Sequence, residues 1–411
     1  MHHPILIIVF FVFSLNVWGQ DSEYRSDILV PELRHADNLV LWSAFGGYNS
    51  FDSLNEQYRH QFGQELSIVF FGVEDLKGDL LFAADAEILP DAVIVPSDFL
   101  GLHQDYRFQA IDKENFPQSE RGNSKDAYFG YPITTGNFLL LYYNKLLVSN
   151  PASSWDELFQ QAQQLSEKGI QAITWQYRAP FYFLPFYYAF GGNIETNEAL
   201  KLNNEAMLSA LKSYKEIVEQ ADLIRFCGRS CDSFDFLNGQ VAYTIDGDWN
   251  YREFKRALGD NLGVAAIPAI KGHAVRGLSS NYVIAFPKNK KESEANRKQK
   301  MKSLIEFFNK DKTQTHIFHE YGLYPASIDP NSKLNKRTSE FESQFFTLLN
   351  DSISIQSHAS ISFMWSALSN NVLAVLQDQI GIEKAAYNID AETQELAGKF
   401  EQLRSQKRVL K

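Results

Sequence analysis

The 411-residue sequence has little cysteine: its two cysteines, Cys227 and Cys231, both lie in one short Cys-Gly-Arg-Ser-Cys segment. So few cysteines exclude a disulfide-rich scaffold. A metal site at this pair would need further ligands, and no histidine lies near them. The three intervening residues also differ from the two of thioredoxin-like redox motifs. In an exported chain, an isolated pair this close favours a single small disulfide loop, with a metal site as the weaker alternative.

The sequence also lacks a long apolar stretch: its one N-terminal apolar run is too short to span a bilayer comfortably, and no second membrane segment follows. Residues 5–17 have the length of the apolar core of a secretory signal, and small residues follow at Val17 and Gly19. We therefore expect residues 1–19 to be a signal peptide cleaved near Gly19, and the mature protein to be periplasmic. No Lys or Arg precedes the run, so an uncleaved anchor is the alternative. No cysteine lies near the cleavage site, so the sequence does not indicate a lipid anchor.

Positive charge is in deficit, with 39 Lys and Arg against 50 Asp and Glu and a net charge of −11. No basic cluster lies on a recognisable nucleic-acid-reading element, so we expect no nucleic-acid partner. The main charge run, residues 288–302, mixes both signs. We interpret it as a solvated face and the start of a helix rather than as a binding patch.

The motifs of several enzyme classes are missing as well. There is no Gly-x-Ser-x-Gly elbow, no His-Glu-x-x-His and no phosphate-binding Gly-x-x-x-x-Gly-Lys-Ser/Thr, and the nine histidines are scattered. We therefore predict no catalytic residues, no metal site and no cofactor. Because carboxylates are plentiful, the sequence leaves a glycosidase pair open.

Aromatic residues, in contrast, are abundant, with 32 Phe, 19 Tyr and 6 Trp, together 14% of the chain. Hydrophobic residues make up 45% and charged residues 22%, which is typical of a soluble globular protein with a large core. A chain of this length suits two lobes of about 150–200 residues each. Beyond the core, so many aromatic rings suit a pocket that stacks against flat apolar faces.

One stretch, residues 241–251, predicts a strand, a tight turn and the start of a helix. The turn would place Trp249 at the carboxyl end of a sheet, where ligands bind in open α/β folds. The alternative is that Trp249 is an ordinary core residue. We expect Asp246 and Asp248 to act as turn and helix-cap residues rather than as a catalytic pair.

Before this stretch, strands and helices alternate, which predicts an α/β lobe with a parallel sheet. The expected elements are strands 38–42, 66–71 and 90–96 and helices 50–62 and 73–84. Residues 131–137 and 321–325 are candidate crossing segments between lobes. A helix is expected to start at an N-cap, Ser154, with Glu157 three residues on. The chain from Phe341 onward is expected to be helical.

Taken in order, several motifs resemble extracellular solute-binding proteins of family 1, the maltose-binding-protein-like sugar-binding components of ABC importers. The motifs are Gly47-Tyr48-Asn49, Leu89-Pro90-Asp91 with Val95-Pro96-Ser97-Asp98, Tyr131-Pro132-Ile133 with Tyr142-Tyr143-Asn144-Lys145, Ser154-Trp155-Asp156-Glu157-Leu158, and Phe236-Leu237-Asn238-Gly239-Gln240-Val241-Ala242 followed by Gly247-Asp248-Trp249. The resemblance covers nearly the whole chain after the N-terminal run.

The resemblance implies a two-lobed α/β periplasmic-binding-protein fold of type II. Each lobe would hold a central, mostly parallel sheet flanked by helices, and the ligand would bind in the cleft between them. The expected N-terminal lobe comprises residues 25–133 plus 281–324, and the C-terminal lobe residues 134–280 plus 325–411. The resemblance also implies binding of a sugar or oligosaccharide, delivery to a membrane-embedded ABC permease, and a monomer.

Five ligand-binding residues follow from the resemblance, position by position: Tyr48, Asp98, Phe181, Trp249 and Trp365. Other polar positions of the family pattern are changed in this chain. Val95 stands in place of a tryptophan, Ala179 in place of an acid, a glutamate of the crossing segment falls near Gly136 or Asn137, and a lysine near the end of the first strand is missing. These changes argue against maltose itself.

Three further hypotheses stay open at this point. The chain could be an exported polysaccharide-active enzyme with Asp98 as one of two catalytic acids. It could be a ligand-sensing subunit for a membrane sensor. The same fold could also bind a polyamine, ferric ion or small anion. The adjacent pairs Tyr142-Tyr143 and Tyr187-Tyr188 would be the iron ligands, but neighbouring residues of a strand face opposite ways.

Overall fold

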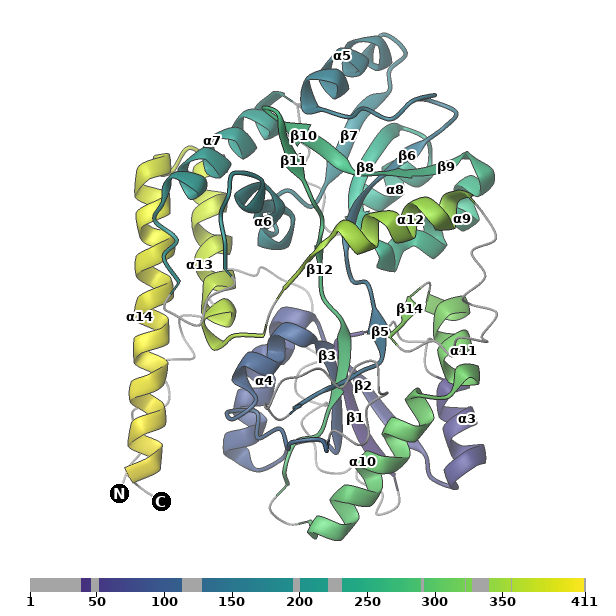
Figure 1. The fold of residues 1–411 in the computed structure, drawn as a ribbon, viewed down its shortest axis with the longest axis vertical. Coiled ribbons are helices and arrows are strands. Elements are labelled where there is room, and N and C mark those ends of the chain that lie inside the picture. Colours follow the sequence, from purple (N-terminus) through teal and green to yellow (C-terminus); the bar gives the residue numbers. More distant parts are fainter. Residues whose placement is uncertain are drawn as a thin grey trace.

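The computed structural model has two lobes, each built around one β-sheet, which lie one above the other in Figure 1. Short crossing strands run between them. The structure describes residues 38–45, 52–112, 128–194, 200–220, 231–289, 292–321, 323–326, 340–355 and 357–409.

The first sheet has the strand order β2-β1-β3-β13-β4. Its strands are β1 (Leu39–Ser43), β2 (Leu66–Phe70), β3 (Ala92–Pro96), β4 (Tyr131–Pro132) and β13 (Tyr282–Ala285). Strands β2, β1 and β3 are parallel, as the alternating pattern predicts, whereas β13 runs antiparallel to β3 and β4. The chain enters β13 from the crossing region, so this strand starts at the edge of the sheet where β1 and β3 end.

Helices cover both faces of the first sheet. They are α3 (Asp52–Phe62), α4 (Val73–Ala86), the 3-10 helix η2 (Ser97–Leu102), α10 (Glu294–Phe308) and α11 (Asp311–Tyr321). The apolar residues of α3 recur at helical spacing and bury Leu54 and Tyr58 on one face of the sheet. In the same way, α4 buries Leu76 and Leu80 on the other face. The sheet is therefore enclosed on both faces, as a parallel sheet requires.

The second sheet has the order β7-β8-β6-β9. Its strands are β6 (Leu139–Asn144), β7 (Gln171–Trp175), β8 (Val241–Gly247) and β9 (Leu262–Ala265). Strands β7 and β8 are parallel, but β6 is antiparallel to both of its neighbours. The sheet thus contains more antiparallel pairs than expected. Strand β6 enters this lobe directly from the crossing region and runs away from the crossing region, whereas β7 and β8 run toward the crossing region.

The second lobe has its own helices and short strands. They are α5 (Trp155–Ser166), α6 (Pro180–Ala189), α7 (Glu205–Gln220), α8 (Cys231–Leu237), η4 (Asp248–Asn250), α9 (Tyr251–Leu258), η5 (Gly259–Asn261), α12 (Glu340–Asp351), and the hairpin β10 (Ile267–Ile270) and β11 (His273–Val275). The predicted N-cap is confirmed, since the Ser154 side chain accepts a hydrogen bond from the Glu157 N–H.

Two pairs of short strands lie where the chain passes between the lobes. Strand β5 (Thr134–Thr135) pairs with β14 (Tyr324–Pro325) in antiparallel fashion, and β12 (Leu278–Ser279) pairs with β15 (Ile353–Ser354) in parallel fashion. In Figure 1, β5, β12 and β14 lie between the two sheets.

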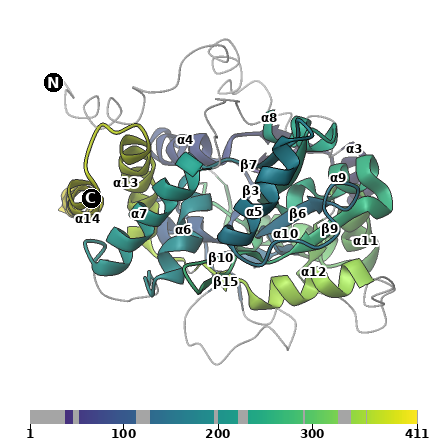
Figure 2. The same cartoon turned by 90° about the horizontal axis from the view of Figure 1, so that it is seen from above.

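The last two helices, α13 (Ala359–Leu376) and α14 (Ile382–Val409), form a hairpin along one side of both lobes (Figures 1 and 2). In the second lobe, Asp390 Oδ1 accepts a hydrogen bond of 2.6 Å from the Leu202 N–H. Near the other end of α14, Arg404 forms a two-pronged ion pair with Asp105, which follows η2 of the first lobe. Within the described residues, α13 alone has the length and hydropathy of a membrane span, but its buried side chains pack into the core of the second lobe.

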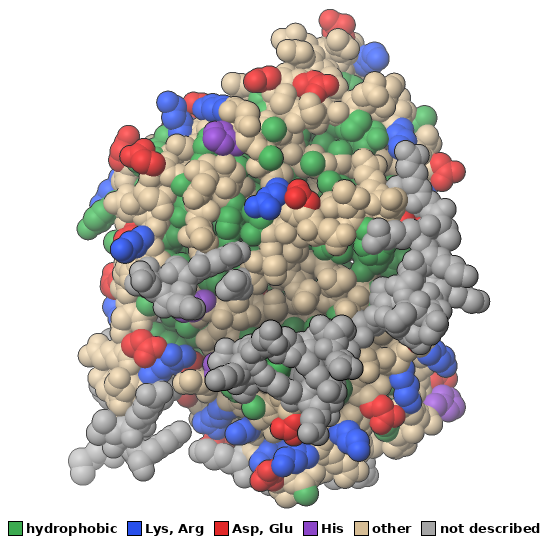
Figure 3. All heavy atoms as spheres, in the orientation of Figure 1, with side chains coloured by type: hydrophobic (Ala, Val, Ile, Leu, Met, Phe, Trp, Pro, Cys, Tyr) green, Lys and Arg blue, Asp and Glu red, His purple; other side chains and the backbone are tan. Residues whose placement is uncertain are grey.

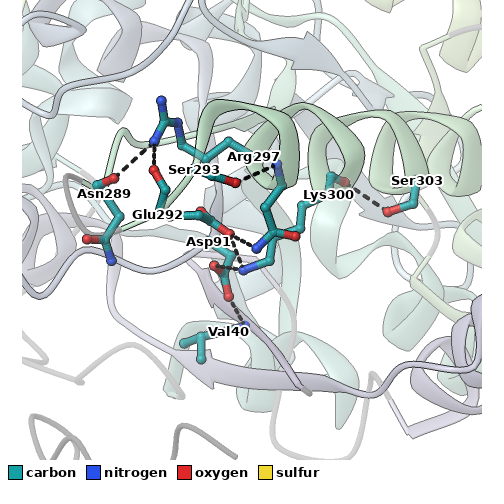
Figure 4. A network of polar contacts seen from close by, with 9 residues as sticks. Val40, Asp91, Asn289, Glu292, Ser293, Arg297, Lys300 and Ser303 are labelled. Carbon is teal, nitrogen blue, oxygen red and sulfur yellow. Dashed lines mark hydrogen bonds and ion pairs between the residues drawn. The ribbon is translucent and has the colours of Figure 1, made fainter. Parts of the chain in front are cut away.

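A charged network supports the first sheet at the edge opposite the crossing strands (Figure 4). Asp91 accepts hydrogen bonds from the Val40 N–H, at 2.8 Å, and from Lys300 Nζ, at 2.7 Å. Lys300 also lies 2.7 Å from Glu292, so one ammonium joins two carboxylates. All three charged side chains are mostly buried, with exposures of 21% for Lys300, 17% for Asp91 and 14% for Glu292. The network ties α10 to the start of β1 and β3.

Candidate functional site

The carboxyl ends of the parallel strands in the two sheets face each other across the crossing strands. In the first sheet, β1 and β3 end at this edge and β13 begins there, with Tyr282 paired to Pro96. In the second sheet, β7 and β8 end at the facing edge. The carboxyl ends of parallel strands are where α/β folds bind ligands, because the loops that follow them converge there. The candidate site therefore lies between these edges.

The predicted strand–turn–helix around Trp249 is confirmed. Strand β8 ends at Gly247, the turn η4 follows, and α9 starts at Tyr251. The Trp249 ring folds back over Gly247, so that a Cβ at this glycine would collide with the ring. Trp249 is half-buried. The glycine therefore lets the indole lie flat against the end of the strand, which fixes its direction.

Three of the predicted aromatic residues meet at the facing edges. The Phe181 ring lies with its centroid 6.2 Å from that of Trp249 and 6.2 Å from that of Trp365, with an interplanar angle of 47° in each case. Phe181 is in the first turn of α6, where Pro180 starts the helix, and Trp365 comes from α13. Segments far apart in the sequence thus form one continuous aromatic wall.

The predicted carboxylate, Asp98, joins the same cluster from the first lobe. It lies in the first turn of η2, directly after β3, and the Trp365 Nε1–H donates a 3.2 Å hydrogen bond to its Oδ2. Only 7% of Asp98 is exposed, and this burial raises the pKa of its carboxyl group above the ordinary value. The nearby Lys77 ammonium acts in the opposite direction. Asp98 and Trp365 therefore link the two lobes through one polar contact.

Lys77, on α4, is a site residue that we did not predict from the sequence. Its Nζ lies 3.9 Å from Asp98, 3.3 Å from Glu74 and 6.0 Å from the centroid of the Trp365 ring. Its side chain is 15% exposed. An ammonium beside a carboxylate and an aromatic ring can donate hydrogen bonds that the carboxylate cannot. No signal in the sequence separates Lys77 from the other charged residues of this helix.

Asp246 has the predicted role in the turn. Its Oδ1 accepts hydrogen bonds from the Gly247 N–H, at 2.7 Å, and from the Tyr182 hydroxyl, at 3.3 Å, and its Oδ2 accepts one from Asn250 Nδ2, at 2.8 Å. These contacts hold the turn that carries Trp249 against the start of α6. Asp246 thus holds in place the turn and the helix start that carry Trp249 and Phe181.

The prediction that Asp248 caps the next helix is wrong. Helix α9 has Asn250 as its N-cap, with no side-chain cap hydrogen bond. The Asp248 carboxylate instead accepts hydrogen bonds from the backbone N–H groups of Asn137, at 2.9 Å, and Phe138, at 3.2 Å, in the crossing segment before β6. Gly136 permits this approach, because a Cβ there would collide with Asp248 Oδ2 and its φ is +121°. Asp248 is fully buried, and burial raises its pKa to about 7.

Comparison with known proteins identifies the family. Residues 55–333 match the family described as bacterial extracellular solute-binding protein. The chain belongs to this family. Among solved structures, the maltose/maltodextrin-binding domain MalE from Bdellovibrio bacteriovorus, bound to maltotriose, is similar with a TM-score of 0.76 and 20% identity, covering 88% of this chain and 99% of that chain. The predicted two-lobed, type II periplasmic-binding-protein fold is thus confirmed.

Some predictions for this solute-binding protein fall outside the described residues. Tyr48 and Cys227 belong to segments that the structure does not describe, and for Cys231 it gives only the backbone, in α8. The ligand role of Tyr48 and the disulfide therefore stay predictions. Across the described ranges, no group of three or more His, Cys, Asp or Glu side chains could hold a metal ion.

The paired tyrosines do not assemble an iron site. Tyr142 and Tyr143 point into different core clusters, and the Tyr142 hydroxyl donates to the Gly247 carbonyl oxygen at 3.1 Å. The Tyr187 hydroxyl accepts a hydrogen bond of 2.9 Å from Asn204 Nδ2.

On the face drawn in Figure 3, the described acidic and basic side chains are interspersed, with no stripe of one sign. Neither arrangement points to an anionic polymer or a ferric ion.

Proposed function

We propose that this solute-binding protein captures a sugar or oligosaccharide between its lobes, in the periplasm, and delivers it as a monomer to the permease of an ABC transporter. The observation that carries this proposal is the aromatic wall of Phe181, Trp249 and Trp365 beside the buried carboxylate of Asp98. In this proposal the protein is a binder and not an enzyme.

The chemistry of a pyranose suits these residue types. Its apolar face stacks on aromatic rings, and its hydroxyl groups donate to a carboxylate. We place the five ligand-binding residues in the cleft between an N-terminal lobe of residues 25–133 plus 281–324 and a C-terminal lobe of residues 134–280 plus 325–411, with Tyr48 on the edge of the first. Ligand would stabilise the closed arrangement of the lobes, because it contacts both.

The likeness to a protein bound to maltotriose supports a carbohydrate ligand. The changed polar positions argue that the preferred sugar is not maltose: Val95 is a buried strand residue of β3, and Ala179 precedes α6 without a polar side chain. An oligosaccharide with a different linkage or unit fits both facts.

The decisive experiment measures thermal unfolding of the mature protein with maltotriose, cellotriose, xylotriose, chitotriose, polyamines and ferric citrate. A ligand that binds the folded state raises the unfolding temperature by mass action. We expect a shift with one sugar series. Shifts with polyamines or iron alone, or with no compound, would refute the sugar proposal.

A second arm tests the wall itself. Replacing Trp249 with Ala should weaken binding of the selected sugar more than tenfold, or about 1.4 kcal/mol, because a stacking surface is lost. Phe82→Ala, an exposed aromatic residue of α4, serves as the control and should bind normally. Unchanged affinity of the Trp249 variant would remove this residue from the site. Release of sugar products, abolished in Asp98→Asn, would instead establish an enzyme.

A further inference from the structure

Tyr282 occupies the floor between the two facing edges. It opens β13 directly after the crossing strand β12. Its backbone is fixed on both sides: its N–H donates to Thr134 Oγ1 at 3.3 Å, and its carbonyl oxygen accepts a 2.9 Å hydrogen bond from the Ile133 N–H. The crossing segment that carries Ile133 and Thr134 therefore fixes the backbone of this residue at the start of the first-lobe strand β13.

The ring of Tyr282 is packed, whereas its hydroxyl is not engaged. The ring lies 5.1 Å from that of Phe45, and the residue is 8% exposed. Within the described part of the chain, no group forms a hydrogen bond with its hydroxyl. The hydroxyls of Tyr106 and Tyr324, in contrast, are sealed inside the protein without a partner. The exposed remainder of Tyr282 leaves its hydroxyl as the group that a ligand between Asp98 and Asp248 would meet.

The electrostatic surroundings keep this hydroxyl protonated. Burial raises the pKa of Tyr282, and the carboxylates of Asp248 and Asp98, in that order, raise it further. Tyr282 thus lies in the field of a carboxylate from each lobe. A phenol that stays protonated between two carboxylates is a hydrogen-bond donor at any physiological pH. A buried donor without a partner is costly, so a ligand that accepts this hydrogen bond is favoured.

We propose that Tyr282 is a ligand-binding residue whose hydroxyl donates a hydrogen bond to a hydroxyl or ring oxygen of the sugar at the floor of the site. The inference rests on the proposed sugar-binding function. It adds a contact from the crossing segment to the contacts that the two lobes supply. Because the crossing segment of Ile133 and Thr134 fixes the backbone of Tyr282, this contact is in place before the lobes close.

The test compares the wild type, Tyr282→Phe and the control Tyr387→Phe, which changes an exposed tyrosine of α14. Calorimetric titration uses whichever of maltotriose, cellotriose, xylotriose or chitotriose raises the unfolding temperature most. Loss of one neutral hydrogen bond should weaken binding by Tyr282→Phe about three- to tenfold. The unfolding temperature without sugar should stay unchanged, because the hydroxyl has no partner among the described residues. Equal affinities, or an equal loss in the control, would overturn the proposal.

A separate arm decides the case in which no sugar binds, which would refute the proposed function. N-acetylimidazole transfers its acetyl group to an accessible phenolic oxygen, and imidazole leaves with the proton. In the folded protein without ligand, we expect acetylation at Tyr282 and none at the sealed Tyr106, as mapped by mass spectrometry. Equal extents of acetylation at Tyr282 and at Tyr106, whose pKa is also raised by burial, would show that the Tyr282 hydroxyl is no more accessible than a sealed one and would overturn the inference.

Discussion

The replacement of Asp248 by Asn tests how the buried carboxylate at the crossing segment responds to pH. The folded protein holds this carboxyl at a pKa of about 7 against an ordinary value of 3.8, because burial outweighs the hydrogen bonds from Asn137 and Phe138. A raised pKa means that the folded state binds the proton more tightly than the unfolded state. The contribution of this carboxyl group to the free energy of unfolding is therefore fully present below a pH of about 4 and is lost as the pH rises toward 7.

The size of the effect follows from the shift. Each pH unit between the two pKa values lowers the free energy of unfolding by about 1.4 kcal/mol. From pH 5 to pH 8, Asp248 alone should thus cost the wild type about 3 kcal/mol. The amide of the Asp248→Asn variant cannot ionise, so the variant lacks this component. At pH 5 the variant should be less stable by about 1–3 kcal/mol, because its amide group faces one of the two backbone N–H donors without accepting a hydrogen bond. At pH 8 the deficit should vanish or reverse.

The assay is urea unfolding of the wild type and Asp248→Asn at pH 5, 6, 7 and 8, monitored by tryptophan fluorescence. Asp260→Asn, at a fully exposed position, is the matched control and should follow the wild type at every pH. The same difference in unfolding free energy between the wild type and Asp248→Asn at pH 5 and at pH 8 would refute this prediction. A constant difference would mean that Asp248 titrates in the folded state as it does in the unfolded chain.

Three further predictions concern stability and the cysteines. A double-mutant cycle of Arg404→Ala and Asp105→Ala, measured by denaturant unfolding, should give a coupling free energy of about 1–3 kcal/mol, because the two-pronged ion pair is mostly buried. A coupling of zero would mean that α14 does not hold the first lobe. Lys300→Met should lower the free energy of unfolding by about 3 kcal/mol, because two mostly buried carboxylates lose their shared ammonium, whereas a loss below about 1 kcal/mol would contradict this role. Thiol titration of the exported, unfolded protein should find no free thiol, and two thiols would refute the predicted disulfide.

Much of the fold follows from the sequence because apolar periodicity marks elements that are buried on one face. The strand expected at 38–42 is found at Leu39–Ser43, and the helix expected at 73–84 is Val73–Ala86. The direction of β6 did not follow, since it depends on where the chain crosses between lobes rather than on any local pattern. The same holds for α14, whose contact with the first lobe depends on the placement of a partner, Asp105, far away in sequence.

The candidate site was predictable only in part. Asp98, Phe181, Trp249 and Trp365 came from a resemblance, not from their spacing, and the structure brings them together. Lys77 was missed because a lysine three residues after Glu74 has the pattern of an ordinary pair on a helix surface. Its place in the site is set by α13, which arrives from the other end of the chain.

Asp248 shows why local sequence patterns mislead at this site. An aspartate between a strand and a helix usually caps the helix, but two of the hydrogen-bond donors of Asp248 lie 110 and 111 residues earlier in the chain. The next residue is Trp249, so one turn carries both the bond to the crossing segment and a ring of the aromatic wall. The crossing segment bends at Gly136 and Asn137, both with positive φ, and we propose this bend as the place where the lobes rotate relative to each other. In the proposed closure, the carboxylate keeps this bend and Trp249 together, and a change at Asp248 should therefore alter sugar affinity as well as stability.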